Sequence, residues 1–177
     1  PPITRFMPSL GGNVNNRDLV LITGGSGFIG RNLVRELSRN RKLHVFSVDL
    51  THEKFSEIDD VQYLDCDLTN PAEVQKLPMA DYVFHLAAIN GTKYFYEIPE
   101  KVLSVNVNGT INFVNWLQSS KVKRFFFSSS SEVYGFPKVF PTPESEELSI
   151  PDPINPRFSY SSSKILGEII VINFARS

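Results

Sequence analysis

The sequence predicts one α/β domain, in which a parallel β-sheet is covered by helices on both faces. Apolar, strand-like segments alternate with segments that have the apolar spacing of helices over residues 18–177. A glycine-rich turn joins the first strand to the first helix, and neither an internal repeat nor a change of composition divides the chain. Strands that alternate with helices favour right-handed crossovers and a doubly wound sheet in the strand order 3-2-1-4-5.

The first strand, residues 19–23, is apolar and runs directly into the turn. A helix is expected over 27–38, because its apolar and polar residues separate onto two sides at helical spacing. The apolar side carries Phe28, Ile29, Leu33, Val34 and Leu37, and the polar side carries Arg31, Asn32, Arg35 and Glu36. The second strand is predicted at Leu43–Asp49 and a short third strand at 61–64.

A short helix over 71–76 is indicated by Pro71 at its first turn, after Thr69 or Asn70 as the capping residue. The fourth strand is expected at 81–86, a long helix at 99–119 and the fifth strand at 124–128. Three consecutive phenylalanines in the fifth strand predict that it is covered on both faces. A proline-rich loop follows, and the last helix runs from about residue 159 to the end.

Composition narrows the class of protein. The net charge is −1, with 18 basic and 19 acidic residues, so no basic excess points to nucleic acid. No apolar run approaches the roughly 18 residues that a membrane span requires. Cys66 is the only cysteine, which excludes an intrachain disulfide. Residues 1–17 have the proline, glycine and asparagine content of a loose leader and lack the pattern of a secretory signal, so we expect a cytoplasmic protein.

The turn after the first strand predicts a dinucleotide site. Gly24, Gly27 and Gly30 have the spacing G-x-x-G-x-x-G between a strand and a helix. Residues without a Cβ allow tight backbone and a close approach to a ligand, and the free N–H groups of a helix start suit a pyrophosphate. The alternative is a strand-to-helix turn that is glycine-rich for structural reasons alone.

Asp49 ends the second strand, 19 residues after Gly30. A carboxylate there can accept hydrogen bonds from both hydroxyls of an adenosine ribose and would repel a 2′-phosphate, which favours NAD over NADP. The alternative is an exposed turn aspartate, and the nearby Lys54 keeps NADP open. After the third strand, the Asp67 carboxylate in Asp67-Leu68 is either an adenine ligand or a turn residue.

Small residues follow the fourth strand. Ala87 and Ala88 would let backbone lie against the cofactor, whereas His85, directly before them, is expected to be a core residue.

Tyr160 and Lys164 are four residues apart on the last predicted helix and therefore project from one face. The ordinary pKa of tyrosine is near 10, and a lysine ammonium together with an oxidised nicotinamide would favour the phenolate. The serine run 128–131 ends the fifth strand at the same sheet edge, where one hydroxyl could contact a substrate oxygen. The run could also be a plain polar turn.

The chain resembles the extended short-chain dehydrogenase/reductase family, in its NAD-dependent nucleotide-sugar epimerase/dehydratase branch, which has a Rossmann-type fold. The motifs that carry the resemblance lie in the family's order between residues 23 and 164. They are residues 23–30, 85–88 (His-Leu-Ala-Ala), 106–110 (Asn-Val-Asn-Gly-Thr), 128–135 (Ser-Ser-Ser-Ser-Glu-Val-Tyr-Gly) and 160–164 (Tyr-Ser-Ser-Ser-Lys).

The resemblance implies roles for residues at matching positions. Ser130 would be the catalytic serine, Tyr160 the general base, and Lys164 the residue that binds the nicotinamide ribose and lowers the pKa of Tyr160. The implied cofactor-binding residues are Gly24, Gly27, Phe28, Ile29, Gly30, Asp49, Asp67, Leu68, Ala87, Ala88, Tyr160 and Lys164. Glu132 matches a glutamate of many dehydratases and decarboxylases, but Ser131 replaces the aspartate that usually precedes it in dehydratases.

The implied reaction is the transient oxidation of a sugar hydroxyl by bound NAD, followed by epimerisation, dehydration or decarboxylation. No metal is implied, and the resemblance suggests a homodimer through the helices at 99–119 and after 159. Family members are longer, so we expect this chain to be truncated before the substrate domain. The alternatives are an NADPH-dependent carbonyl reductase of the extended family and a non-catalytic nucleotide-binding scaffold, which the complete set of Ser130, Tyr160 and Lys164 disfavours.

Overall fold

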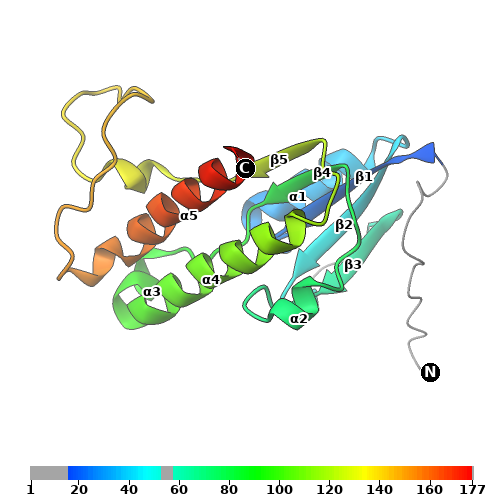
Figure 1. The fold of residues 1–177 in the computed structure, drawn as a ribbon, viewed down its shortest axis with the longest axis horizontal. Coiled ribbons are helices and arrows are strands. Elements are labelled where there is room, and N and C mark those ends of the chain that lie inside the picture. Colours follow the sequence, from blue (N-terminus) through cyan, green and yellow to red (C-terminus); the bar gives the residue numbers. More distant parts are fainter. Residues whose placement is uncertain (1–15, 53–57, 177) are drawn as a thin grey trace.

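The computed structural model describes residues 16–52 and 58–176, so most of the expected leader and Lys54 lie outside the described residues. Five parallel strands form one sheet in the order β3-β2-β1-β4-β5, which confirms the predicted order (Figure 1). The strands are β1 (Asp18–Thr23), β2 (Leu43–Asp49), β3 (Val61–Asp65), β4 (Tyr82–His85) and β5 (Arg124–Phe127). The order reverses between β1 and β4, which opens a crevice at their carboxyl ends.

Helices cover the sheet on both faces (Figure 1). Helix α1 (Phe28–Ser38) lies on one face, and α2 (Pro71–Val74), α4 (Pro99–Leu117) and α5 (Ser159–Arg176) lie on the other. Alternate residues of a strand point to opposite faces. Leu21 of β1 therefore belongs to the core beneath α4, whereas Val20 and Ile22 belong to the core beneath α1.

Three short elements were not predicted from the sequence. They are α3 (Thr92–Glu97) and the 3₁₀ turns η2 (Ser131–Tyr134) and η3 (Pro156–Phe158). Helix α3 buries Phe95, whose ring stacks on Tyr160 at a centroid distance of 4.9 Å. Helix α3 thus packs against a distant part of the chain, and the local apolar pattern of its own residues does not predict the helix.

The prediction that β5 is covered on both faces is wrong. Phe125 and Phe127 face the helices, but the side chain of Phe126 is 46% exposed and stacks on Phe84 at 4.6 Å. The physical reason is position: β5 is the edge strand of the described sheet, and α1 packs against β1 and β2.

None of the described helices is both long and apolar enough to span a membrane. Within residues 16–52 and 58–176, no group of histidine, cysteine and carboxylate side chains has an arrangement that would hold a metal ion.

Candidate functional site

The glycine turn between β1 and α1 has no room for side chains at two positions. Gly24 has φ +70°, which favours glycine, and a Cβ there would lie 2.8 Å from the backbone nitrogen of Ala87. A Cβ on Gly30 would lie 2.0 Å from the carbonyl oxygen of Gly24. Gly27 donates its N–H to that same oxygen at 3.0 Å and precedes the first residue of α1. The turn is therefore rich in glycine for a structural reason, and its contact with a pyrophosphate stays a prediction.

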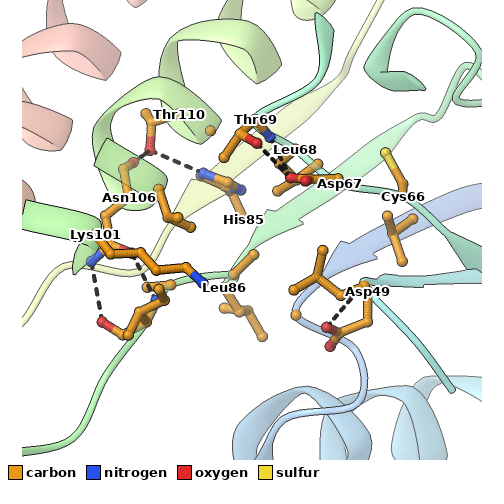
Figure 2. Close-up of a pocket in the computed structure, with 18 residues that line it drawn as sticks. Asp49, Cys66, Asp67, Leu68, Thr69, His85, Leu86, Lys101, Asn106 and Thr110 are labelled. Atoms are coloured by element: carbon orange, nitrogen blue, oxygen red, sulfur yellow. Dashed lines mark hydrogen bonds between the residues drawn. The ribbon is translucent and has the colours of Figure 1, made fainter. Parts of the chain in front are cut away.

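A pocket of about 400 Å³ lies at the carboxyl ends of the strands (Figure 2). It brings together the predicted residues of four separate segments, namely Gly24, Asp49, Asp67, Leu68, Ala87 and Ala88. Its far wall comes from α4, which contributes Lys101, Val105, Asn106, Gly109 and Thr110. Gly27, Phe28, Ile29 and Gly30 are outside this lining, and the side chains of Phe28 and Ile29 are 76% and 63% exposed.

Asp49 joins the end of β2 to the glycine turn. Its Oδ2 accepts the backbone N–H of Ser26 at 2.9 Å, and its Oδ1 accepts that of Leu50 at 2.8 Å. A carboxylate oxygen accepts more than one hydrogen bond, so both oxygens can still receive a ribose hydroxyl. Asp49 is thus fixed beside the turn, and its contact with a ribose stays a prediction.

Asp67 is a turn residue that also lines the pocket. Its Oδ1 accepts the backbone N–H of Thr69 at 2.9 Å and the Thr69 hydroxyl at 2.8 Å, which is the pattern of a turn aspartate. The same residue lines the pocket with Leu68, whose carbonyl accepts the Asn112 amide at 2.9 Å. Contact with an adenine stays a prediction.

His85 is a core residue, as predicted. Its Nδ1 lies 2.8 Å from the Thr23 hydroxyl and its Nε2 lies 3.2 Å from the Thr110 hydroxyl. Burial, with a smaller contribution from the charge of Lys164, lowers the pKa of His85 to about 3, so the ring is neutral at pH 7. The His85 ring also stacks on the ring of Phe113 at a centroid distance of 4.8 Å, which fixes it against α4.

Tyr160 and Lys164 lie buried at the start of α5, with exposed fractions of 6% and 3%. Tyr160 packs in a cluster with Phe95 and Val102, against which Ala88 and Ile89 also pack. Because Ala88 and Ile89 line the pocket, this cluster adjoins the pocket wall. The structure therefore brings the two predicted groups of site residues side by side.

Burial controls both titrations. It raises the pKa of Tyr160, which a hydrogen bond with Ser130 lowers and the charge of Glu132 raises further. It lowers the pKa of Lys164 to about 8. The lowering of the Tyr160 pKa by Lys164 stays a prediction. The Lys164 ammonium donates to the carbonyl oxygen of Ser128 at 2.6 Å and lies 5.8 Å from the centre of the Tyr160 ring.

Comparison with known proteins decides the family. The model of the NAD dependent epimerase/dehydratase family matches residues 20–177. The chain belongs to this family.

Individual relatives agree with the family assignment. UDP-glucuronic acid decarboxylase 5 from Arabidopsis thaliana is 31% identical over 170 residues, which cover 89% of this chain and 46% of the relative. The structure of UDP-glucose 4-epimerase from Thermotoga maritima with UDP-glucose has a TM-score of 0.77 and 31% identity, over 90% of this chain and 52% of that one. A short-chain dehydrogenase/reductase superfamily protein from Agrobacterium tumefaciens with bound NAD has a TM-score of 0.75 and 27% identity, over 90% and 45%. The chain thus spans about half the length of these relatives.

The Asn-Val-Asn-Gly-Thr motif begins with Asn106, whose role the sequence alone does not predict. Asn106 is 6% exposed and connects three elements. Its Oδ1 accepts the N–H of Ile89 at 2.7 Å, while its Nδ2 donates to the Ile89 carbonyl at 3.2 Å and to the Ser163 hydroxyl at 3.0 Å. The signal in the sequence was an asparagine on the apolar side of α4, where a buried amide needs partners.

Three further charged side chains lie at or beside the site, and the sequence does not predict their contacts. Lys101 reaches from α4 across the pocket toward Leu86 (Figure 2). Glu132 pairs with Arg157 at 3.5 Å, which joins η2 to η3 near Tyr160. Spacing in the sequence does not predict these contacts, because the partners come from separate segments.

Proposed function

We propose that this chain is the cofactor-binding part of an NAD-dependent enzyme that oxidises a hydroxyl of a nucleotide sugar and then epimerises, dehydrates or decarboxylates the product. One observation carries the proposal: the cluster around Tyr160 shares Ala88 and Ile89 with the pocket that begins at the glycine turn. A redox cofactor in that pocket would lie beside a buried tyrosine and lysine, which is the arrangement that this chemistry needs.

The pocket residues fit NAD. Its volume is within the range of small-molecule sites, and the absence of a Cβ at Gly24 lets the glycine turn pack directly against the backbone of Ala87 at the pocket. We assign the pyrophosphate to Gly24, Gly27 and Gly30, with Phe28 and Ile29 supplying backbone at the start of α1. We assign the adenosine ribose to Asp49. We assign the adenine to Asp67 and Leu68. The backbone of Ala87 and Ala88 would lie against the cofactor.

The chemistry that a bound NAD would supply is the reversible uptake of a hydride. As the phenolate, Tyr160 would take the proton of the sugar hydroxyl while the carbonyl forms, and Ser130 would hold the same substrate oxygen. Because burial raises the pKa of Tyr160, its phenol is neutral at pH 7 and needs help to lose a proton. That help comes from the Ser130 hydrogen bond and from Lys164, whose pKa of about 8 leaves most of its population charged at pH 7.

Glu132 bears on the second half of the reaction. Its charge raises the pKa of Tyr160, so it lies near the reacting centre, and Arg157 balances it. By the family pattern, a glutamate here accompanies dehydration or decarboxylation. Ser131 in place of aspartate disfavours a 4,6-dehydratase, so we rank decarboxylation and epimerisation above dehydration.

We also propose a cytoplasmic homodimer. Leu166, Ile169 and Ile172 repeat every three residues on α5 with exposed fractions of 43%, 51% and 45%, and Ile111 of the adjacent α4 is 38% exposed. Apolar residues gathered on two packed helices suit a symmetric contact with the same surface of a second copy.

The test is a fluorescence titration of NADH and NADPH with the wild type and Asp49→Asn. Asparagine keeps an oxygen for the Ser26 N–H but loses the charge that holds the ribose hydroxyls. We expect NADH affinity to fall about 10-fold or more, since hydrogen bonds to charged groups contribute about 1.5–3 kcal/mol. NADPH affinity should stay equal or rise. Equal wild-type affinities for the two cofactors would contradict the NAD assignment, and tighter NADPH binding would support the reductase alternative.

A further inference from the structure

Three of the four consecutive serines after β5 contact three residues of α5. Tyr160, Lys164 and Glu168 are spaced four apart and share one helix face. Tyr160 is hydrogen-bonded to Ser130, Lys164 donates to the Ser128 carbonyl, and Glu168 accepts the hydroxyl of Ser129. Two of these three contacts involve the residues to which we assign the chemistry. The third, between Ser129 and Glu168, has no role in the reaction as described above.

The helix and the strand approach each other closely at this point. A Cβ on Gly167 would lie 2.4 Å from Cζ of Phe127, so only glycine allows α5 to pack this near the end of β5. The last bond to β4 is the Ser128 N–H to the His85 carbonyl at 3.1 Å. Beyond it the chain leaves the sheet for η2, and the contact between Ser129 and Glu168 lies between that last bond and Ser130, the N-cap of η2.

Glu168 contacts the serine segment through one hydrogen bond. It is half-buried, and its oxygen receives a hydrogen bond from a neutral hydroxyl, a contact that a charged acceptor strengthens. Its charge is absent from the influences that shift the pKa of Tyr160 or of Lys164. The contact ties Ser129 to α5, whereas burial, Ser130 and the charge of Glu132 shift the pKa of Tyr160.

We infer that Glu168 is a positioning residue, which holds Ser129 and thereby sets the Ser130 hydroxyl against the Tyr160 phenol. The significance for the reaction rests on the proposed function, but the geometric coupling does not.

The coupling is tested in the chain itself by NMR. The reporters are the backbone amide signals of Ser130 and Glu132, whose N–H donates to the Ser130 hydroxyl at 3.2 Å, and the ring carbon of Tyr160 during an alkaline titration. The variants are Glu168→Ala, Glu168→Gln, Ser129→Ala and the double alanine variant. Asn173→Ala is the matched control, because Asn173 lies on the same helix and bonds only locally to the Ile169 carbonyl among the contacts observed.

Glu168→Ala should shift both amide signals and reduce the phenolate fraction of Tyr160 at a given alkaline pH about five-fold, the factor expected for one ordinary hydrogen bond. Glu168→Gln, which keeps an acceptor oxygen, should restore the wild-type titration. Ser129→Ala should match Glu168→Ala, and the double variant should add nothing further. Ser129→Ala is also the fallback if the Glu168→Ala variant fails to fold.

Wild-type amide signals and a wild-type Tyr160 titration in folded Glu168→Ala, or in folded Ser129→Ala, would overturn the inference. So would a glutamine variant as perturbed as the alanine variant, because the charge and not the position would then matter. NADH binding, measured in parallel, tests the proposed function separately. A chain that shows the coupling but binds no NADH would keep Glu168 as the holder of Ser130 and would refute the cofactor assignment alone.

Discussion

Replacing Gly30 by alanine should destabilise the protein, although alanine is the better helix former. Gly30 lies in the first turn of α1, where an added Cβ would be 2.0 Å from the carbonyl oxygen of Gly24 and 2.8 Å from Cα of Gly25. Both neighbours are backbone atoms, so no side chain can rotate away. The helix and the glycine turn must separate by more than 1 Å to reach a contact near 3.3 Å.

The magnitude follows from two opposing effects. Exchanging glycine for alanine within a helix gains about 0.5–1 kcal/mol. Forcing an extra methyl group into packed backbone costs about 1–3 kcal/mol, and a contact this short lies at the upper end. We therefore expect Gly30→Ala to lose about 2 kcal/mol of unfolding free energy. Gly109→Ala is the matched control, because its Cβ would meet only Cβ of Leu68, at an ordinary 3.4 Å, inside α4. It should be neutral or more stable by up to about 1 kcal/mol.

Urea unfolding followed by the fluorescence of Trp116 measures both variants, since this single tryptophan is 2% exposed in the core. NADH titration of Gly30→Ala measures the second consequence, a loss of affinity as the turn moves. A Gly30→Ala variant that is as stable as the wild type and binds NADH equally well would refute the predicted clash. A loss of stability in Gly109→Ala equal to that in Gly30→Ala would also refute it, because a general intolerance of alanine would then explain both.

Three further predictions follow from charge and exposure. Burial lowers the pKa of Lys164 from 10.5 to about 8, so between these pH values the unfolded chain binds a proton that the folded chain has lost. The contribution of Lys164 to the free energy of unfolding therefore rises with pH across that window, by about 3 kcal/mol at most. Unfolding curves of Lys164→Met should lack this rise. Lys101→Met should weaken NADH binding about five-fold and reduce the salt dependence of the NADH affinity. Lys93→Met, on the exposed surface of α3, should change neither quantity. Ile169→Asp should convert a dimer to a monomer in light scattering, and a wild-type chain that is monomeric at high concentration would contradict the dimer.

The sheet and its order followed from the sequence because each strand is a local apolar run and the crossovers have a fixed hand. The glycine turn was equally predictable, since the backbone itself demands glycine at Gly24 and Gly30. The exposure of Phe126 was not predictable, because an apolar run shows that a strand can be buried but does not show which helices cover it. The missed α3 has the same cause: Phe95 is buried by Tyr160, which lies 65 positions further along the chain (160 minus 95).

The residues of the candidate site also differ in how far the sequence predicts them. Residues that a ligand would contact directly carry their chemistry in the sequence, so Asp49, Tyr160 and Lys164 could be chosen before the fold was known. Residues that hold those groups in place, such as Asn106 and Glu168, are recognised only by their partners on other elements. The pKa of Tyr160 depends on this second group: burial raises it, and the opposing hydrogen bond exists only while Ser130 is held in reach. A change at Glu168 should therefore alter proton transfer at Tyr160 without touching it, which no motif confined to Tyr160 and Lys164 could reveal.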